Sequence, residues 1–202
     1  MWNANYGGPL YGFQGYTKAG MMLSMLGGIV GDTAVLRAMS EYAKAWQFKH
    51  PSPWDYAFSM SNALHQDLGW FWYYWLFTTE SVDGSIKNVT TSGTPPRTTV
   101  VVRQDGQMPS PIVLKVELAP EGLATFARNT PSVTTSPTGT AKVLDSRTVL
   151  VTYPVDVWFG GSRTFNAQLN FGRRKIVKIT LDPDRRFPDR NPADNVWPRE
   201  VH

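Results

Sequence analysis

The hydrophobic period of this chain changes along its length, and that change constrains the fold more than any other feature. Up to about residue 89, apolar residues recur every three or four positions, which is the spacing of an amphipathic helix. From about residue 97 they alternate with polar residues, which is the pattern of half-buried antiparallel strands. Helix and strand patterns that do not interleave favour separate units. The sequence therefore predicts an α+β protein, with an N-terminal helical subdomain followed by an all-β antiparallel sandwich.

Three helices are predicted from apolar stripes and from residues suited to helix ends. The first runs from Thr17 to Val30 and ends at Gly31, because glycine readily adopts the left-handed conformation that follows many helices. Ser52 is a suitable N-cap for the third helix, and Pro53 fits its first turn. The stripe of the second helix consists of Val35, Met39, Tyr42, Ala43 and Trp46.

A fourth helix, beginning after Asp67, consists almost entirely of aromatic and apolar residues. Its run Leu68–Phe77 has ten residues, whereas a membrane-spanning helix needs about 20, so we expect a core helix and no membrane span. A helix that is apolar on every side requires contact all round. We therefore expect the chain to self-associate through whatever part of this helix it leaves uncovered. Residues 82–89 are expected to form a short last helical turn.

The β unit is predicted from alternating runs and from the turn residues between them. The alternating runs cover residues 112–118, 164–171 and 177–181, and shorter valine-rich runs lie at 100–102 and 149–151. Gly160-Gly161 and Gly172 are expected to be hairpin turns, and Asp105-Gly106 is a further turn signal.

A segment rich in Thr, Pro, Ser and Gly separates the two patterns and is predicted to be a linker. The predicted organisation is a helical unit over residues 1–89, a linker over 90–96 and a β-sandwich over 97–202.

Composition excludes several classes of protein. The chain has no cysteine, so disulfide frameworks and thiolate metal sites are excluded. Residues 1–88 contain five Lys/Arg against six Asp/Glu, and residues 89–202 contain fifteen against ten, so the two halves carry net charges of −1 and +5. Acidic residues are interspersed among the basic ones of the second half, so no nucleic-acid partner is expected.

Three segments of the sequence form a recognisable series. The first is Gly15-Tyr16-Thr17-Lys18-Ala19-Gly20. The second is Trp46–Thr79, in which a KHPSPWDYAF helix start precedes a WFWYYWLF helix. The third is LDPDRRFPDRNPADNVWP near the end of the chain. In type and order they resemble the M1-type zinc aminopeptidases, or gluzincins, and specifically the C-terminal part of the helical catalytic domain and the β-sandwich that follows it. The family's zinc signature, His-Glu-x-x-His, does not occur in this sequence.

The resemblance implies a catalytic role for Tyr16. In the family, the tyrosine of this element donates its hydroxyl to the oxyanion formed when zinc-bound water attacks the peptide carbonyl. Ala19 stands here where many members have glycine. Tyr11 is expected to line the same cleft and contact substrate. The resemblance also implies that zinc belongs to a parent enzyme acting on peptides. The zinc ligands would lie in a preceding catalytic part that this chain lacks, so we expect this chain to hold no metal and to be inactive alone.

Several other residues have simpler interpretations. His50 and His65 are fifteen residues apart, whereas a zinc-binding pair needs two histidines on one helix face, so both are expected to pack or cap. Six consecutive aromatic residues at 70–75 point in all directions on a helix, which favours core packing over a stacking platform. The Asp and Asn residues of the tail have the oxygen chemistry that calcium prefers, but they lie beside prolines, which favours turns.

A rival interpretation is a non-catalytic binding module, a β-sandwich with a helical leader. The two hypotheses differ in the upstream reading frame, which encodes His-Glu-x-x-His only under the first. Because the sequence contains no signal-like segment, it does not indicate a compartment. It does not indicate substrate preference or oligomeric state either.

Overall fold

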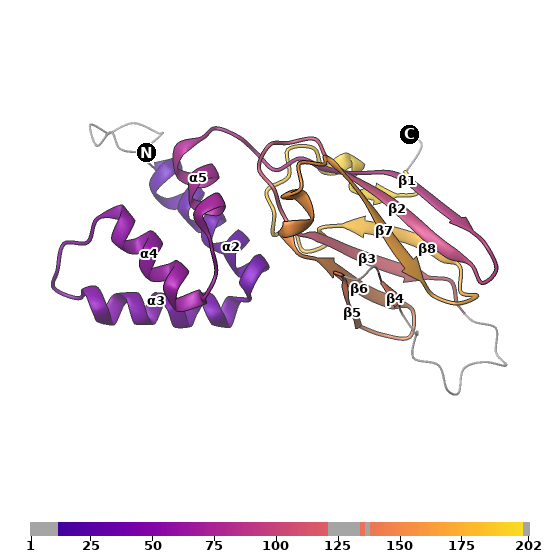
Figure 1. The fold of residues 1–202 in the computed structure, drawn as a ribbon, viewed down its shortest axis with the longest axis horizontal. Helices are drawn as coiled ribbons and strands as arrows, with labels where there is room; N and C mark the ends of the chain where they lie inside the picture. The colour runs from indigo at the N-terminus through magenta and orange to yellow at the C-terminus, as the bar shows by residue number, and fades with distance from the viewer. Residues whose placement is uncertain (1–11, 121–133, 136–137, 200–202) are drawn as a thin grey trace. The chain divides into compact units, whose positions relative to one another are not determined.

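The computed structural model describes residues 12–120, 134–135 and 138–199 (Figure 1). The chain divides into two compact units, Met1–Glu80 and Ser81–His202, and each is described by itself. The first is helical and the second consists of two antiparallel sheets, which confirms the predicted α+β class. Among the described residues no single helix is long and apolar enough to cross a membrane. One bent pair, Gly15–Val30 with Asp32–Trp46, meets that test only when taken together, across an angle of 119°.

The described part of the helical unit starts with a π-helix, which leads directly into an α-helix. Its described elements are η1 (Phe13–Lys18), α2 (Ala19–Val30), α3 (Asp32–Trp46), α4 (Pro53–Leu64) and α5 (Gly69–Phe77). The sequence predicted that the first helix begins at Thr17, but the helical segment starts earlier, at Phe13. Its first residues, up to Lys18, have the wider π-helical geometry.

The predicted helix ends at Gly31 and Ser52 are confirmed. Gly31 has φ of 94°, and its N–H donates to the Gly27 carbonyl at 2.9 Å, which ends α2. Ser52 accepts from the Asp55 N–H through its hydroxyl, and Asp55 accepts from the Ser52 N–H at 2.7 Å. This reciprocal capping box satisfies two backbone donors that the first turn of α4 leaves without helical partners.

Aromatic residues pack against one another within the helical unit. Tyr56 on α4 contacts Tyr42 edge-on at 5.0 Å between ring centroids and Trp72 at 5.8 Å. Burial, with the neighbouring Tyr42 as a second cause, raises the pKa of Tyr56 to about 12. The Trp72 indole N–H donates to the Ser61 hydroxyl at 3.1 Å, so this ring is buried with its polar atom satisfied.

The helix α5 buries one face rather than its whole circumference. Phe71, Trp72 and Trp75 are buried, at the spacing of a single helical face. Tyr73 and Phe77 are 56% and 47% exposed. The expectation of contact all round is therefore wrong within this unit.

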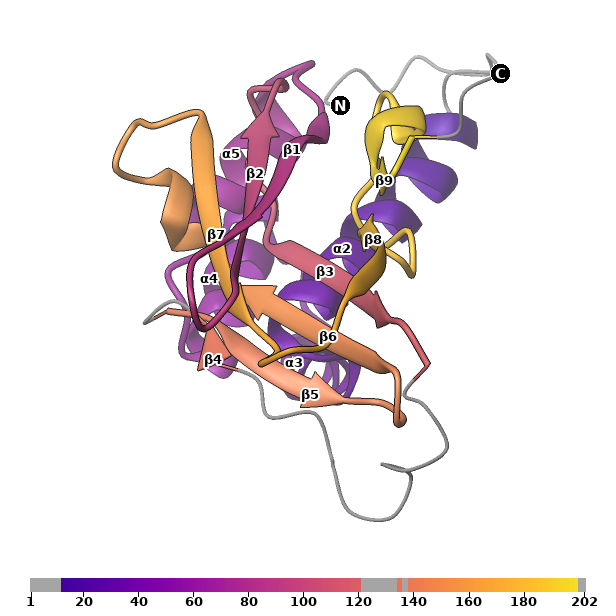
Figure 2. The same cartoon turned by 90° about the vertical axis from the view of Figure 1, so that its right-hand side faces the viewer.

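In its described residues, the second unit is a sandwich of a four-stranded and a five-stranded sheet. The four-stranded sheet has the order β1-β2-β7-β4, and the five-stranded sheet has the order β5-β6-β3-β8-β9. Figure 2 shows the two sheets as separate layers. The strands are β1 (Gly84–Ser92), β2 (Arg97–Gln104), β3 (Ile112–Leu118), β4 (Thr134–Thr135), β5 (Thr140–Val143), β6 (Thr148–Tyr153), β7 (Thr164–Asn170), β8 (Ile176–Leu181) and β9 (Val196–Trp197).

The alternation seen in the sequence fills the space between the sheets. In β3, every second residue from Ile112 to Leu118 is buried. Val116 lies opposite Val149 of β6 and Ile179 of β8, and all three are fully buried. The facing sheet contributes Val100 and Ala167, which are opposite each other in β2 and β7. Full burial of a Val or Ile side chain stabilises a fold by roughly 1.5–3 kcal/mol.

The predicted boundary between the units is wrong. The β unit begins at Ser81 instead of residue 97, because residues 84–92 form β1 rather than a last helical turn and the start of a linker. A β-bulge between Ile86 and Asn88 interrupts the alternation, which removes the signal that would have identified a strand. The remaining Gly-Thr-Pro-Pro stretch, 93–96, is the turn of the β1–β2 hairpin, with φ of 86° at Gly93.

The predicted turns are present, but they do not close hairpins. The segments that contain Asp105-Gly106, Gly160-Gly161 and Gly172 connect β2 to β3, β6 to β7, and β7 to β8. The two strands of each pair belong to different sheets. The chain therefore crosses between layers at these points, and only the tertiary arrangement distinguishes such a crossing from a hairpin.

We expect Gly106→Ala to destabilise the sandwich. A Cβ at this position would lie 2.3 Å from the Ser81 carbonyl oxygen and 2.7 Å from the Asp83 nitrogen, both of them backbone atoms. The required backbone shift should cost about 1–3 kcal/mol in the free energy of unfolding, measured by denaturant titration. Gly160→Ala is the matched control, because a Cβ there has no atom within 4 Å. Equal stability of the two variants would contradict this account.

Candidate functional site

Tyr16 lies on the π-helix η1, the first described element of the helical unit. Its side chain is 74% exposed. The structure thus places Tyr16 inside a helical turn, where its phenol ring reaches the surface. π-helical turns are uncommon and occur frequently at functional sites. Tyr11, the second residue predicted for this site, lies outside the described residues.

Two glycines, Gly15 and Gly20, lie close to Tyr16 in the sequence. A Cβ placed on Gly15 or on Gly20 would meet no atom within 4 Å. The phenol hydroxyl is a neutral hydrogen-bond donor on a rigid ring, which suits it to bind an oxygen that gains negative charge during a reaction.

The two internal histidines occupy separate positions. His50 is exposed and lies in the segment before α4, while His65 is exposed and ends that helix. His65 has φ of 52°, and its N–H donates to the Asn62 carbonyl at 3.2 Å. The prediction that the two histidines pack or cap therefore holds for His65, which is the C-cap of α4, whereas His50 is exposed and caps no described helix. The structure does not bring the two residues onto one helix face.

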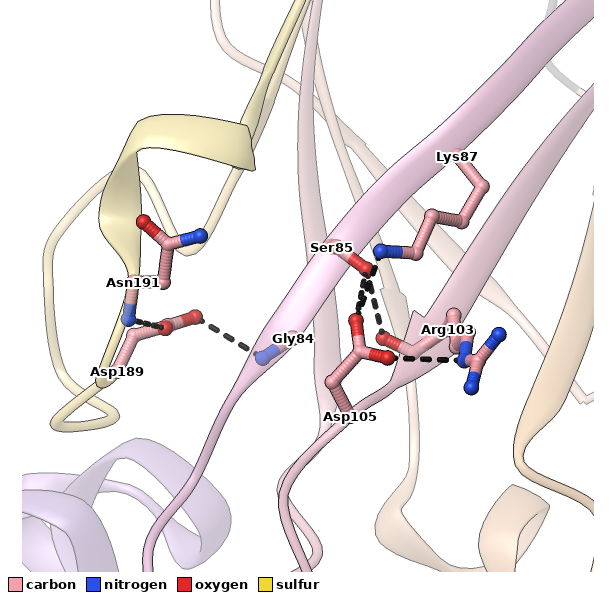
Figure 3. A network of polar contacts seen from close by, with 7 residues as sticks. All are labelled: Gly84, Ser85, Lys87, Arg103, Asp105, Asp189 and Asn191. Atoms are coloured by element: carbon pink, nitrogen blue, oxygen red, sulfur yellow. Dashed lines mark hydrogen bonds and ion pairs between the residues drawn. The ribbon is translucent and has the colours of Figure 1, made fainter.

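A polar network that the sequence did not predict surrounds Asp105 at the end of β2 (Figure 3). Its carboxylate accepts from Lys87 Nζ at 2.8 Å, from the Ser85 hydroxyl at 2.7 Å and from Arg103 Nε at 2.9 Å. Lys87, followed by the Ser85 hydroxyl and Arg103, holds the pKa of Asp105 below its ordinary value, although partial burial opposes the shift. The three partners come from β1 and β2, so the network joins the two strands where their pairing begins.

The tail of the chain returns to the same corner through Asp189. One carboxylate oxygen of Asp189 accepts from the Gly84 N–H at 3.1 Å and from Asn195 Nδ2 at 3.0 Å, and the other accepts from the Asn191 N–H at 2.8 Å. A residue 105 positions away thereby holds the first residue of β1 (Figure 3). No local pattern could have revealed this contact.

A second tail aspartate, Asp182, also binds backbone donors. Its two oxygens accept from the Arg186 and Phe187 N–H groups at 3.0 and 2.9 Å. Burial raises its pKa although these hydrogen bonds oppose the shift. Asp182 and Asp189 thus organise the turns of the tail, as the turn interpretation predicted. Asp83 lies near this corner, and burial followed by the charges of Asp189 and Asp194 raises its pKa.

Comparison with known proteins identifies a similar fold. No family model matches the chain, and no curated protein sequence matches it. Among solved structures, aminopeptidase A of Legionella pneumophila, crystallised with aspartic acid, superimposes with a TM-score of 0.60 and 13% sequence identity. The match covers 89% of this chain and 18% of the other. This chain therefore spans less than a fifth of the aminopeptidase and shares its fold with that part of it.

We expect Asp105→Asn to lower the stability of the sandwich at neutral pH. Because the folded-state pKa of Asp105 is lowered, its stabilising contribution is fully present above the unfolded-state pKa and is lost as the pH falls through the folded-state pKa. Hydrogen bonds to charged groups contribute about 1.5–3 kcal/mol. The Asp105 side chain is 29% exposed, so solvent screening should reduce the loss to about 1 kcal/mol.

Denaturant unfolding of both proteins at pH 7 and at about pH 3 measures the effect, and the two stabilities should converge at the lower pH. Glu117→Gln is the control, because Glu117 makes a single pair with Lys115 at 3.5 Å near the surface. A stability difference for Asp105→Asn that is the same at both pH values would contradict the electrostatic explanation.

Proposed function

We propose that this chain is the C-terminal portion of an M1-type zinc aminopeptidase, in which Tyr16 stabilises the oxyanion. The observation that carries the proposal is the fold match to part of an aminopeptidase over 89% of the chain. The resemblance of Gly15–Gly20, Trp46–Thr79 and the tail to the gluzincins supports it independently, because those segments were identified without reference to the fold.

The chain's own residues contribute binding and hydrogen bonding in this proposal. Tyr16 is 74% exposed, so the oxygen of a bound peptide carbonyl could reach its phenol, which would donate a hydrogen bond to it. Tyr11 would contact the substrate nearby. His50 and His65 do not fit a zinc ligand set, so the proposal assigns the zinc ligands to a preceding part of the polypeptide. Bound there, zinc supplies the activated water, and the chain alone is inactive.

A second candidate function is a non-catalytic binding module. Exposed aromatic rings on the helical unit favour it, since Trp54 and Phe58 are 51% and 65% exposed and such residues are enriched at interfaces. Under this alternative, Tyr16 is a surface residue and no peptidase segment accompanies the chain.

The coding sequence upstream of Met1 tests the two functions against each other. We expect it to encode His-Glu-x-x-His in the same frame. Elemental analysis should then find about one zinc per molecule in the full-length product, because that motif with a later glutamate forms a catalytic zinc site. The 202-residue chain should hold no stoichiometric zinc. A native protein that starts at Met1 would refute the peptidase proposal and favour the binding module.

In the full-length enzyme, Tyr16→Phe should lower kcat by about 10²–10³-fold. Phenylalanine keeps the ring and removes only the hydroxyl, whose hydrogen bond strengthens as charge develops on the substrate oxygen. The loss should therefore appear equally in kcat and kcat/KM, with little change in KM. Steady-state kinetics on an aminoacyl chromogenic substrate measures it, with zinc content determined in parallel.

Two matched variants control this experiment. Tyr73→Phe removes a hydroxyl from another exposed tyrosine, on α5, and should leave turnover unchanged. Tyr11→Phe should lower kcat much less than Tyr16→Phe, because Tyr11 is expected to contact the substrate but not the oxygen on which charge develops. Near-normal turnover of Tyr16→Phe with full zinc occupancy would show that Tyr16 has no catalytic role.

A further inference from the structure

The tail of the β unit forms a cleft beside β8. The cleft has a volume of about 320 Å³, and its lining includes Thr180 of β8, Val196 of β9 and residues of the turns that connect these strands. Small-molecule sites in proteins have volumes of about 300–1,000 Å³, so the cleft is large enough for a small ligand. Every lining residue is described and belongs to the second unit.

Two carboxylates in the lining of the cleft retain capacity to accept hydrogen bonds. Each oxygen of Asp182 accepts one backbone N–H, at 3.0 and 2.9 Å, whereas an ionised carboxylate has about four lone-pair sites. Asp189 accepts from three N–H groups and also lines the cleft (Figure 3). Among the described residues, neither carboxylate forms an ion pair with a Lys or Arg side chain. The cleft therefore presents acceptors of negative charge.

An amide beside these carboxylates has an acceptor without a donor. Asn195 lines the cleft and is 6% exposed. Its Nδ2 donates to Asp189 at 3.0 Å, but its Oδ1 atom is buried and accepts from no described residue. A buried acceptor that lacks a donor destabilises a structure. A ligand that brings N–H groups to this site would remove that cost.

The other lining residues indicate the body of the ligand. Phe187, Pro183 and Pro188 give the cleft apolar surface, against which an aliphatic chain gains free energy by leaving water. A hydrated metal ion gains nothing from such surface. Arg185 also lines the cleft, but its side chain is exposed. An anionic ligand would meet two carboxylates, so the lining favours an organic cation.

We propose that this cleft binds a protonated primary amine carried on a short aliphatic chain. An ammonium group has three donors and no acceptor, which matches a site that offers the oxygens of Asp182, Asp189 and Asn195. The chain packs against the apolar residues. The amine belongs either to a free small molecule or to a lysine side chain of another polypeptide. This binding site lies wholly in the β unit and does not depend on the peptidase function.

The experiment titrates the 202-residue chain with n-butylammonium and follows the backbone amide resonances of Thr180 and Asn195 by NMR. We expect saturable one-to-one binding. The analogue n-butyltrimethylammonium keeps the charge and the chain but has no N–H donor. It should bind at least about tenfold more weakly, because it cannot form hydrogen bonds to the charged acceptors.

A third probe, Nα-acetyl-lysine methylamide, distinguishes the two sources of the amine. It presents the ammonium group as a lysine side chain does. Tighter binding of this probe than of n-butylammonium would identify the lysine of a polypeptide as the ligand. Tighter binding of n-butylammonium would identify a free amine. Both results support the amine site.

Two pairs of variants locate the binding in the cleft. Asp182→Asn removes one charge and should weaken the Kd for n-butylammonium at least about tenfold. Asp184→Asn is its matched control, because Asp184 is exposed in the same turn and does not line the cleft. Pro192→Phe should also weaken binding, because it narrows the cleft while keeping both carboxylates. Ala193→Phe is the control for it, since Ala193 is exposed and outside the lining.

Circular dichroism and the Tm check that each variant is folded, and Pro192→Phe decides the question if Asp182→Asn unfolds. Failure of n-butylammonium to bind saturably would overturn the proposal, and so would an unchanged Kd in the folded variants of the cleft. Equal affinity for n-butyltrimethylammonium would also overturn it. Calcium that shifts the same resonances where the amine does not would show an inorganic cation site instead.

Discussion

The burial of alternating aliphatic side chains between two sheets is the constraint on which the β unit depends. Val116 at the centre of β3 is fully buried between Val149 and Ile179 of its two neighbouring strands. A shift of one residue in the register of β3 would turn its whole apolar set outward. This core fixes the register of the strands. The positions of the loops, of the tail and of the polar corner, which is the network around Asp105 and Asp189, all follow from that register.

The polar corner completes the sandwich where the apolar core ends. Asp105 neutralises cations from β1 and β2, and Asp189 from the tail holds the Gly84 N–H at the first residue of β1. An edge strand has unpaired backbone groups on one side and few buried side chains of its own. Charge-assisted hydrogen bonds from distant parts of the chain compensate for that weakness in β1, which buries only Ser85 and Ile86.

The helical unit separates the residues that maintain the fold from those that face outward. Met25, Met60 and Phe71 are buried in its interior, whereas Tyr16 and Phe58 lie at its surface. The fold match to part of an aminopeptidase, at 13% identity, shows that this arrangement of helices and sheets occurs within a much longer polypeptide.

The sequence by itself determined the features that depend on neighbouring residues. It predicted the helical and β units from their periods, the end of α2 at Gly31, and the cap of α4 at Ser52, because helix signals act within one turn. It also identified Tyr16 as a candidate, since its short motif is local. Only the tertiary structure decided the rest. It made β1 a strand despite a bulge that hides its alternation, and it made the turn at Gly172 a crossing between sheets. It also brought Asp189 to Gly84. These outcomes depend on contacts between residues far apart in the chain, whose free energy no local pattern of residues records.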